Sequence, residues 1–278
     1  MAQSLKTRTA RRALALTITA MIALAILAAI ASRALSLRDT THASGWLLLI
    51  LIVFLAAYNL RKKLTYPPML SASVWLHLHV YIGLLCIVIF LAHTGVRVPT
   101  GVLEGSLSIL FSTVAVSGII GLALSRAIPP RLADRGEEVL FERIPTHRRQ
   151  LRERAEAIIF RWIEHDDSAT LSDFYQSRLA DFFTRPMHTW HHLFQSSRPR
   201  RRLLNELHEL NRYLDREGRE ASQELSELIC VKDDLDYHRI MQGMLKGWLF
   251  VHLPLTYVML LIAVLHIVLA MAFSGSAL

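Results

Sequence analysis

The sequence has few of the residues that mark several protein classes. Only 2 of its 278 residues are cysteine and 19% are charged, against about 25% charged in an ordinary soluble domain. Two cysteines exclude a multi-disulfide scaffold, and Cys86 and Cys230 are expected to be reduced structural residues. The sequence has no CxxC, CxxCH, GxGxxG or Walker A motif, the patterns of clusters, covalent haem and nucleotide sites. A hydrophobic fraction of 53% excludes a disordered chain.

The apolar residues are concentrated in five stretches that are long enough, or nearly so, to cross a membrane. A transmembrane helix needs about 20 mostly apolar residues. The five stretches are 13–32, 45–60, 71–93, 104–125 and 247–273, and a polar segment separates the last two. The sequence therefore predicts an all-α, polytopic membrane bundle of five transmembrane helices, with a helical insertion between the fourth and fifth. The predicted domains are 1–125, 126–246 and 247–278.

The net charge of +8 lies entirely outside the polar segment. Residues 126–246 hold 21 basic and 21 acidic residues, while the rest of the chain holds 10 basic residues against Asp39 and Glu104. Short cytoplasmic loops are enriched in lysine and arginine. Seven of these ten basic residues lie in the N-terminal segment and in the loop between the second and third spans, which are on the same side of the membrane. We therefore expect a bacterial-type inner membrane protein with the N-terminus and the insertion in the cytoplasm and the C-terminus outside. A neutral insertion offers no electrostatic footprint for nucleic acid.

The first span also has features of a signal peptide, with a basic start and small residues near Ala29 and Ala31. Its apolar run is longer than the hydrophobic region of a signal peptide, which favours a retained helix. The pair Arg11-Arg12 lacks the context of a twin-arginine signal.

Histidines fall in only two of the five spans, the third and the fifth. His79 and His93 are 14 residues apart, and so are His252 and His266. Fourteen residues make almost four helical turns, so both members of a pair face nearly the same way, about 21 Å apart along the axis. The third and fifth spans are predicted to be parallel, which would bring His79 level with His252 and His93 level with His266. Neutral imidazoles at matched depth suit two b-type haems, each held through both axial positions.

With this pattern the sequence resembles the membrane di-haem b cytochromes. His-x13-His on two helices, separated by a helix without ligands, is the arrangement of the cytochrome b/b6 family and of the ferric reductase and NADPH oxidase membrane domain. The resemblance covers 71–125 and 247–273. It implies iron ligation by His79 and His252 for an inner haem, and by His93 and His266 for an outer haem. Cytochrome b lacks such an insertion, however, and the reductases continue into a flavin and nicotinamide domain that this sequence lacks.

Other residues near the proposed haems have two interpretations each. Gly83 and Gly118, with Gly121, either let a haem approach or allow close helix packing. Arg97 for the outer haem, and Lys246 or Arg126 for the inner one, either bind propionates or set topology. The alternative to haem ligation itself is a set of isolated histidines hydrogen-bonded across helices. His77 is off the histidine stripe, and a helix–helix bond, a propionate contact and a quinone contact are its candidate roles.

The insertion is predicted to form short amphipathic helices over 148–165, 169–185, 201–217 and 221–229. Residues 184–202, TRPMHTWHHLFQSSRPRRR, could lie on the anionic leaflet or dock a partner. A metal site at His188, His191 and His192 is disfavoured because adjacent histidines on a helix diverge. The cluster Asp233, Asp234, Asp236 and His238 either handles protons near a quinone or is a solvated charge run.

The function that these features favour is electron transfer between the quinone pool and a partner protein. The expected partners are membrane lipid, quinone, and either a multihaem c-type cytochrome or an iron–sulfur or flavin subunit. Two alternatives are a transmembrane metalloreductase, acting on ferric iron or oxygen, and a haem-free membrane anchor.

Overall fold

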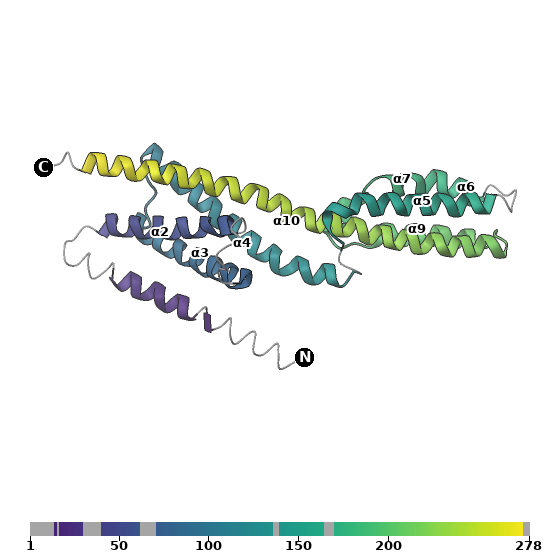
Figure 1. The fold of residues 1–278 in the computed structure, drawn as a ribbon, viewed down its shortest axis with the longest axis horizontal. Helices are drawn as coiled ribbons and strands as arrows, with labels where there is room; N and C mark the ends of the chain where they lie inside the picture. Colours follow the sequence, from purple (N-terminus) through teal and green to yellow (C-terminus); the bar gives the residue numbers. More distant parts are fainter. Residues whose placement is uncertain are drawn as a thin grey trace. The chain divides into compact units, whose positions relative to one another are not determined.

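The computed structural model describes residues 14–15, 17–29, 40–61, 71–135, 139–163 and 170–274, in which all regular structure is helical (Figure 1). These residues divide into two compact units. The first, here called the span unit, comprises the described residues up to Leu122 together with 249–274. The second, the polar unit, comprises Ala123–Trp248.

Four helices are long and apolar enough to cross a membrane. They are α2 (Thr40–Arg61), α3 (Ala72–Thr94), α4 (Val102–Ala133) and α10 (Arg216–Ser274). The chain is therefore a multi-pass membrane protein by the length and composition of its helices. The described part of the first predicted span is a shorter helix, Thr17–Ala29. Residues 13, 16 and 30–32 of that span lie outside the described residues, so the predicted total of five is not confirmed and four are supported.

Helices α4 and α10 are longer than the predicted spans that they contain. The predicted span 104–125 is continued to Ala133 because Ile128 and Leu132 are buried against Tyr237 and Met241 of α10 in the polar unit. In α10, the acidic stretch 232–243 is helical, so the predicted helix 221–229 and the fifth span belong to one helix. The helix continues through Gly243, Gly247 and Pro254, although Pro254 has no N–H to donate to the preceding turn.

The span unit has an apolar core to which four helices contribute. Its buried residues are Leu48, Ile52, Leu85, Cys86, Ile89, Phe111 and Met259. Helices α2 and α3 lie side by side and antiparallel: Ser44 meets His93 near one end, and Tyr58 meets His79 near the other. The rings of Phe90 and Phe111 stack 4.1 Å apart between α3 and α4.

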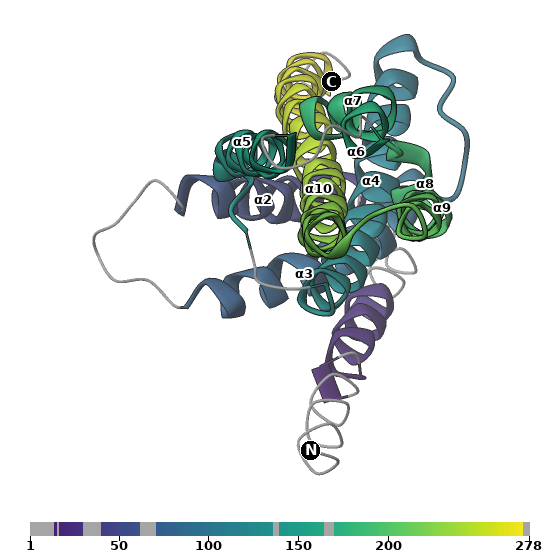
Figure 2. The same ribbon diagram turned by 90° about the vertical axis from the view of Figure 1, so that its right-hand side faces the viewer.

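In the polar unit, helices surround the first half of α10 (Figure 2). They are α5 (Ile144–Ile163), α6 (Thr170–Phe174), α7 (Ala180–Thr184), α8 (Thr189–Leu193) and α9 (Arg198–Leu210). Between α6 and α7 lies a π-helical turn, Tyr175–Leu179, and a 3₁₀ turn, Phe141–Arg143, precedes α5. The predicted helix over 201–217 ends at Leu210, and α10 begins at Arg216.

The helices of the polar unit form because their apolar residues recur every three or four positions and meet in one core. In α5 the buried residues are Ile144, Leu151, Ala155, Ile158, Ile159 and Trp162. They pack with Phe182 and Phe183 of α7 and with Leu225 and Ile229 of α10.

Candidate functional site

Two partly buried histidines stand on α3 and two on α10, with a packed core between the two levels. Cys86 is seven residues from both His79 and His93, and Met259 is seven residues from both His252 and His266. Cys86 and Met259 are 2% and 3% exposed and belong to the same apolar core. The midpoints of the two histidine pairs therefore belong to one buried core, with one histidine of each helix on either side of the midpoint.

At one level, His93 packs against α2. Its Nδ1 lies 3.0 Å from Oγ of Ser44. A Cβ added at the neighbouring Gly45 would lie 3.0 Å from Cε1 of His93, so the imidazole occupies the space that a larger residue would need. His266 of α10 lies in the neighbourhood of His93.

The hydrogen bonds of Ser44 assign the tautomer of His93. The Ser44 hydroxyl donates its single hydrogen to the carbonyl oxygen of Thr41 at 3.0 Å. Oγ must therefore accept from Nδ1–H of His93. The lone pair of the neutral ring is then on Nε2, which is the nitrogen available to a metal.

At the other level, His252 and His79 contact different neighbouring helices. Nδ1 of His252 lies 3.2 Å from Oγ of Ser117 on α4, and a Cβ added at Gly118 would lie 3.8 Å from Cε1 of His252. His79 packs against Tyr58 of α2, with ring centroids 5.3 Å apart.

Contacts with α2 show that α3 and α10 run in the same direction. Next to Tyr58, Asn59 donates to the Tyr257 hydroxyl at 2.9 Å. From Tyr257, α10 continues towards His266, which lies in the neighbourhood of His93 at the opposite end of α2. Both α3 and α10 are therefore antiparallel to α2.

The sequence alone did not indicate a role for Ser44 and Ser117, although a repeated dipeptide marks both positions. Ser44-Gly45 and Ser117-Gly118 are the same dipeptide on two apolar helices. In both, the serine hydroxyl meets Nδ1 of a histidine and the glycine lies beside the ring, tightly at Gly45 and at ordinary contact distance at Gly118. Of these four residues, Gly118 alone was predicted to be part of the site.

No family model, no curated protein and no solved structure matches this chain.

The remaining predicted site residues have varied surroundings. Gly83 has no heavy atom within 4 Å of an added Cβ, and Arg97 is exposed just beyond α3. Lys246 contacts Glu142, whose pKa it lowers by hydrogen bonding, and lies 4.1 Å above the ring of Phe141. His77 is exposed and its Nδ1 bonds the carbonyl oxygen of Ser73 in its own helix.

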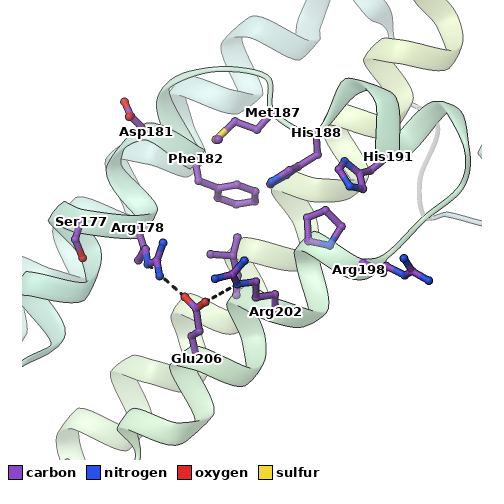
Figure 3. A pocket seen from close by; sticks show the side chains of 12 residues that line it. Ser177, Arg178, Asp181, Phe182, Met187, His188, His191, Arg198, Arg202 and Glu206 are labelled. Carbon is purple, nitrogen blue, oxygen red and sulfur yellow. Dashed lines mark hydrogen bonds and ion pairs between the residues drawn. The ribbon is translucent and has the colours of Figure 1, made fainter.

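The polar unit has a cavity of about 470 Å³ between the π-helical turn, α8 and α9 (Figure 3). Glu206 on its wall pairs with Arg178 at 3.4 Å and with Arg202 at 2.9 Å. His188 and His191 also line it. Among the described residues, no group of three or more histidine, cysteine or acidic side chains could hold a metal.

The acidic cluster on α10 is buried and paired. Lys232 is fully buried, contacts Asp236, donates to the carbonyl oxygen of Arg185 at 2.9 Å and lies 4.0 Å above the ring of Phe182. Asp236 also accepts from the backbone N–H of Met187 at 3.1 Å.

A second part of the cluster surrounds Asp233. His192 lies 3.4 Å from it, and the guanidinium groups of Arg135 and Arg200 approach within 3.8 and 3.7 Å. Burial lowers the pKa of His192 to about 4 and raises the pKa of Asp233. His238 bonds the carbonyl oxygen of Arg135. Because these groups tie the segment after α4 to α8, α9 and α10, the cluster is not a solvated charge run.

Proposed function

We propose that this chain is an electron-transfer membrane protein that binds two b-type haems. His79 and His252 would hold one, and His93 and His266 the other. The observation that supports the proposal most directly is the equal 14-residue histidine spacing on the parallel helices α3 and α10, with Cys86 and Met259, the midpoints of the two spacings, in one buried core. The two histidines on each helix are about 21 Å apart along its axis. Together the four histidines supply the four axial donors that two haems require.

The hydrogen bonds around the histidines support ligation through Nε2. A metal-bound histidine normally donates its other ring N–H to a neighbouring acceptor, which fixes its orientation. Ser44 accepts from His93 in this way, and Ser117 lies against the same nitrogen of His252.

Haem supplies one-electron redox chemistry when bound. The residues of this chain hold and orient the imidazoles and exclude water between the two levels with Leu85, Cys86 and Ile89. Because no other redox-centre motif is present in the sequence, the electrons must be exchanged with other molecules. We propose that one of these molecules is quinone from the membrane pool, and that the other is a multihaem c-type cytochrome or an iron–sulfur or flavin subunit.

The same proposal includes a topology. The distribution of basic residues supports an inner-membrane protein with a cytoplasmic N-terminus, a cytoplasmic polar unit and an external C-terminus.

The absorption spectrum of the purified chain tests the proposal. We expect a bis-histidine b-haem spectrum with two haems per chain and two transitions in a redox titration. His93→Ala or His266→Ala should each remove one haem, and the one at the other level should remain. His77→Ala is the matched control, because His77 is on α3 but bonds its own helix. A chain without haem, or full haem content in His93→Ala, would refute the proposal.

A further inference from the structure

A short helix of the polar unit exposes two large aromatic side chains. Trp190 and Phe194 are 71% and 76% exposed. Phe194 directly follows α8 and is one turn from Trp190, since its N–H donates to the carbonyl oxygen of Trp190 at 3.1 Å, so the two side chains lie on the same side of the helix. Exposed aromatic residues at this density are typical of a surface that contacts another phase or partner.

The opposite face of α8 is fixed beside the ends of two membrane helices. Leu193 packs on a cluster formed by Ile128 and Leu132 of α4 and Tyr237 and Met241 of α10. Ile128 is three residues beyond the predicted span of α4, and Met241 is six residues before that of α10. At 1.5 Å per residue these offsets are only about 5 and 9 Å.

Both ends of α8 are held in strained conformations. His188 and Gln195 have φ of 61° and 56°, which is uncommon for residues other than glycine and persists only where the surroundings impose it. With its amide oxygen towards Arg131, Gln195 accepts from Nη1 and Nε at 3.0 and 2.9 Å. Arg131 is six residues beyond the predicted span of α4, so this contact joins the end of α8 to the continuation of that helix.

The sequence on either side of α8 is basic, although Arg185, Arg200 and Arg202 are paired with acidic residues of other segments or of their own helix. Residues 185–202 contain five arginines and no acidic residue. Arg131, Arg198 and Arg201 are exposed and form no ion pair with any residue in the described part of the chain. Aromatic and basic side chains together bind the headgroup region of an anionic membrane surface.

We infer that α8 is an interfacial anchor, with Trp190 and Phe194 inserted into the headgroup region of the bilayer that α4 and α10 cross. Phospholipid is the ligand. The anchor fixes the polar unit to the membrane next to the two helices that lead into it. This does not depend on haem binding.

Site-directed spin labelling of the full chain in vesicles tests this inference. Trp190→Cys and Phe194→Cys would be made in a Cys230→Ser background, since Cys86 is buried in the core. The vesicles contain phosphatidylcholine and phosphatidylglycerol. Tyr213→Cys is the matched control, because Tyr213 is equally exposed but precedes the start of α10, about 46 Å along that helix from Gly247.

We expect the ratio of collisions with oxygen to collisions with an aqueous nickel complex to be several times higher at positions 190 and 194 than at 213. Ratios at 190 and 194 equal to that at 213 would overturn the inference, and would instead fit a docking face for a soluble partner. Either labelled position is sufficient, so failure of one variant to fold leaves the other as the test.

Discussion

Oγ of Ser44 lies 3.0 Å from Nδ1 of His93 and donates its own hydrogen to Thr41. This chain of two hydrogen bonds connects a backbone carbonyl of α2 to a ring nitrogen of α3, and leaves Nε2 of His93 with the lone pair. A serine on α4 stands at the same ring atom of His252. One histidine of each proposed haem pair therefore has a serine partner, which can be removed without touching the ligand itself.

Ser44→Ala should weaken haem binding at the level of His93. Loss of the acceptor frees the imidazole to rotate and to change tautomer, and such outer hydrogen bonds are typically worth about 10–100-fold in metal affinity. The fraction of haem that the purified protein retains on dilution measures this affinity. Ser106→Ala is the control, because Ser106 is exposed and donates to Val102 in its own helix. Equal retention in the two variants would contradict the prediction.

Gly45→Ala should displace His93. The added Cβ would be 3.0 Å from Cε1 of the ring, a distance that requires the imidazole or α2 to move. At Gly118 the corresponding distance to His252 is 3.8 Å, which is ordinary contact, so Gly118→Ala should be tolerated. The position and width of the low-temperature haem absorption bands would report the change. The prediction fails if both variants match the wild type, or if Gly118→Ala is the more damaging of the two.

The histidine spacing could be recognised from the sequence because helix periodicity converts residue numbers directly into depth and direction. The parallel direction of α3 and α10 was likewise predictable from charge and order along the chain. Ser44 and Ser117 were not, because their role depends on which faces of α2 and α4 meet the histidine helices. An apolar helix with little polar contrast does not reveal its inward face.

The polar unit illustrates a different difficulty. The run KDDLDYH looks solvated by composition, but Lys232 and Asp236 are buried because the backbone of 185–187 and the ring of Phe182 surround them. These partners are about 50 residues away in the sequence. Local periodicity cannot identify such partners, and so the continuous helix through Asp233 and His238 was also missed.

Lys232→Met should destabilise the polar unit by about 3–5 kcal/mol, since it leaves the buried Asp236 without its cation. Lys246→Met is the control: its partner Glu142 is exposed, and an exposed ion pair contributes little to stability because solvent screens it. Hydrogen exchange of α5 and α7 in the detergent-solubilised chain measures the local free energy of opening. Adding Asp236→Leu to Lys232→Met should recover part of the loss, although Met187 N–H would lose its acceptor. If Lys232→Met lowers the free energy of opening no more than Lys246→Met does, the Lys232–Asp236 pair is not buried.

Acid should weaken the polar unit through His192. Burial lowers its pKa from 6.5 to about 4 in the folded chain, so between these pH values the unfolded state binds more protons than the folded state. The stabilisation is therefore complete above about pH 6.5 and is lost as the pH falls towards 4, by at most about 3 kcal/mol. Hydrogen exchange of α5 and α7 measures the free energy of opening across this pH range. This free energy should fall less in His192→Gln, because glutamine cannot take up the proton. His191→Gln, an exposed neighbour, should keep the wild-type profile. If His192→Gln loses as much stability as the wild type, protonation of His192 does not limit the unit.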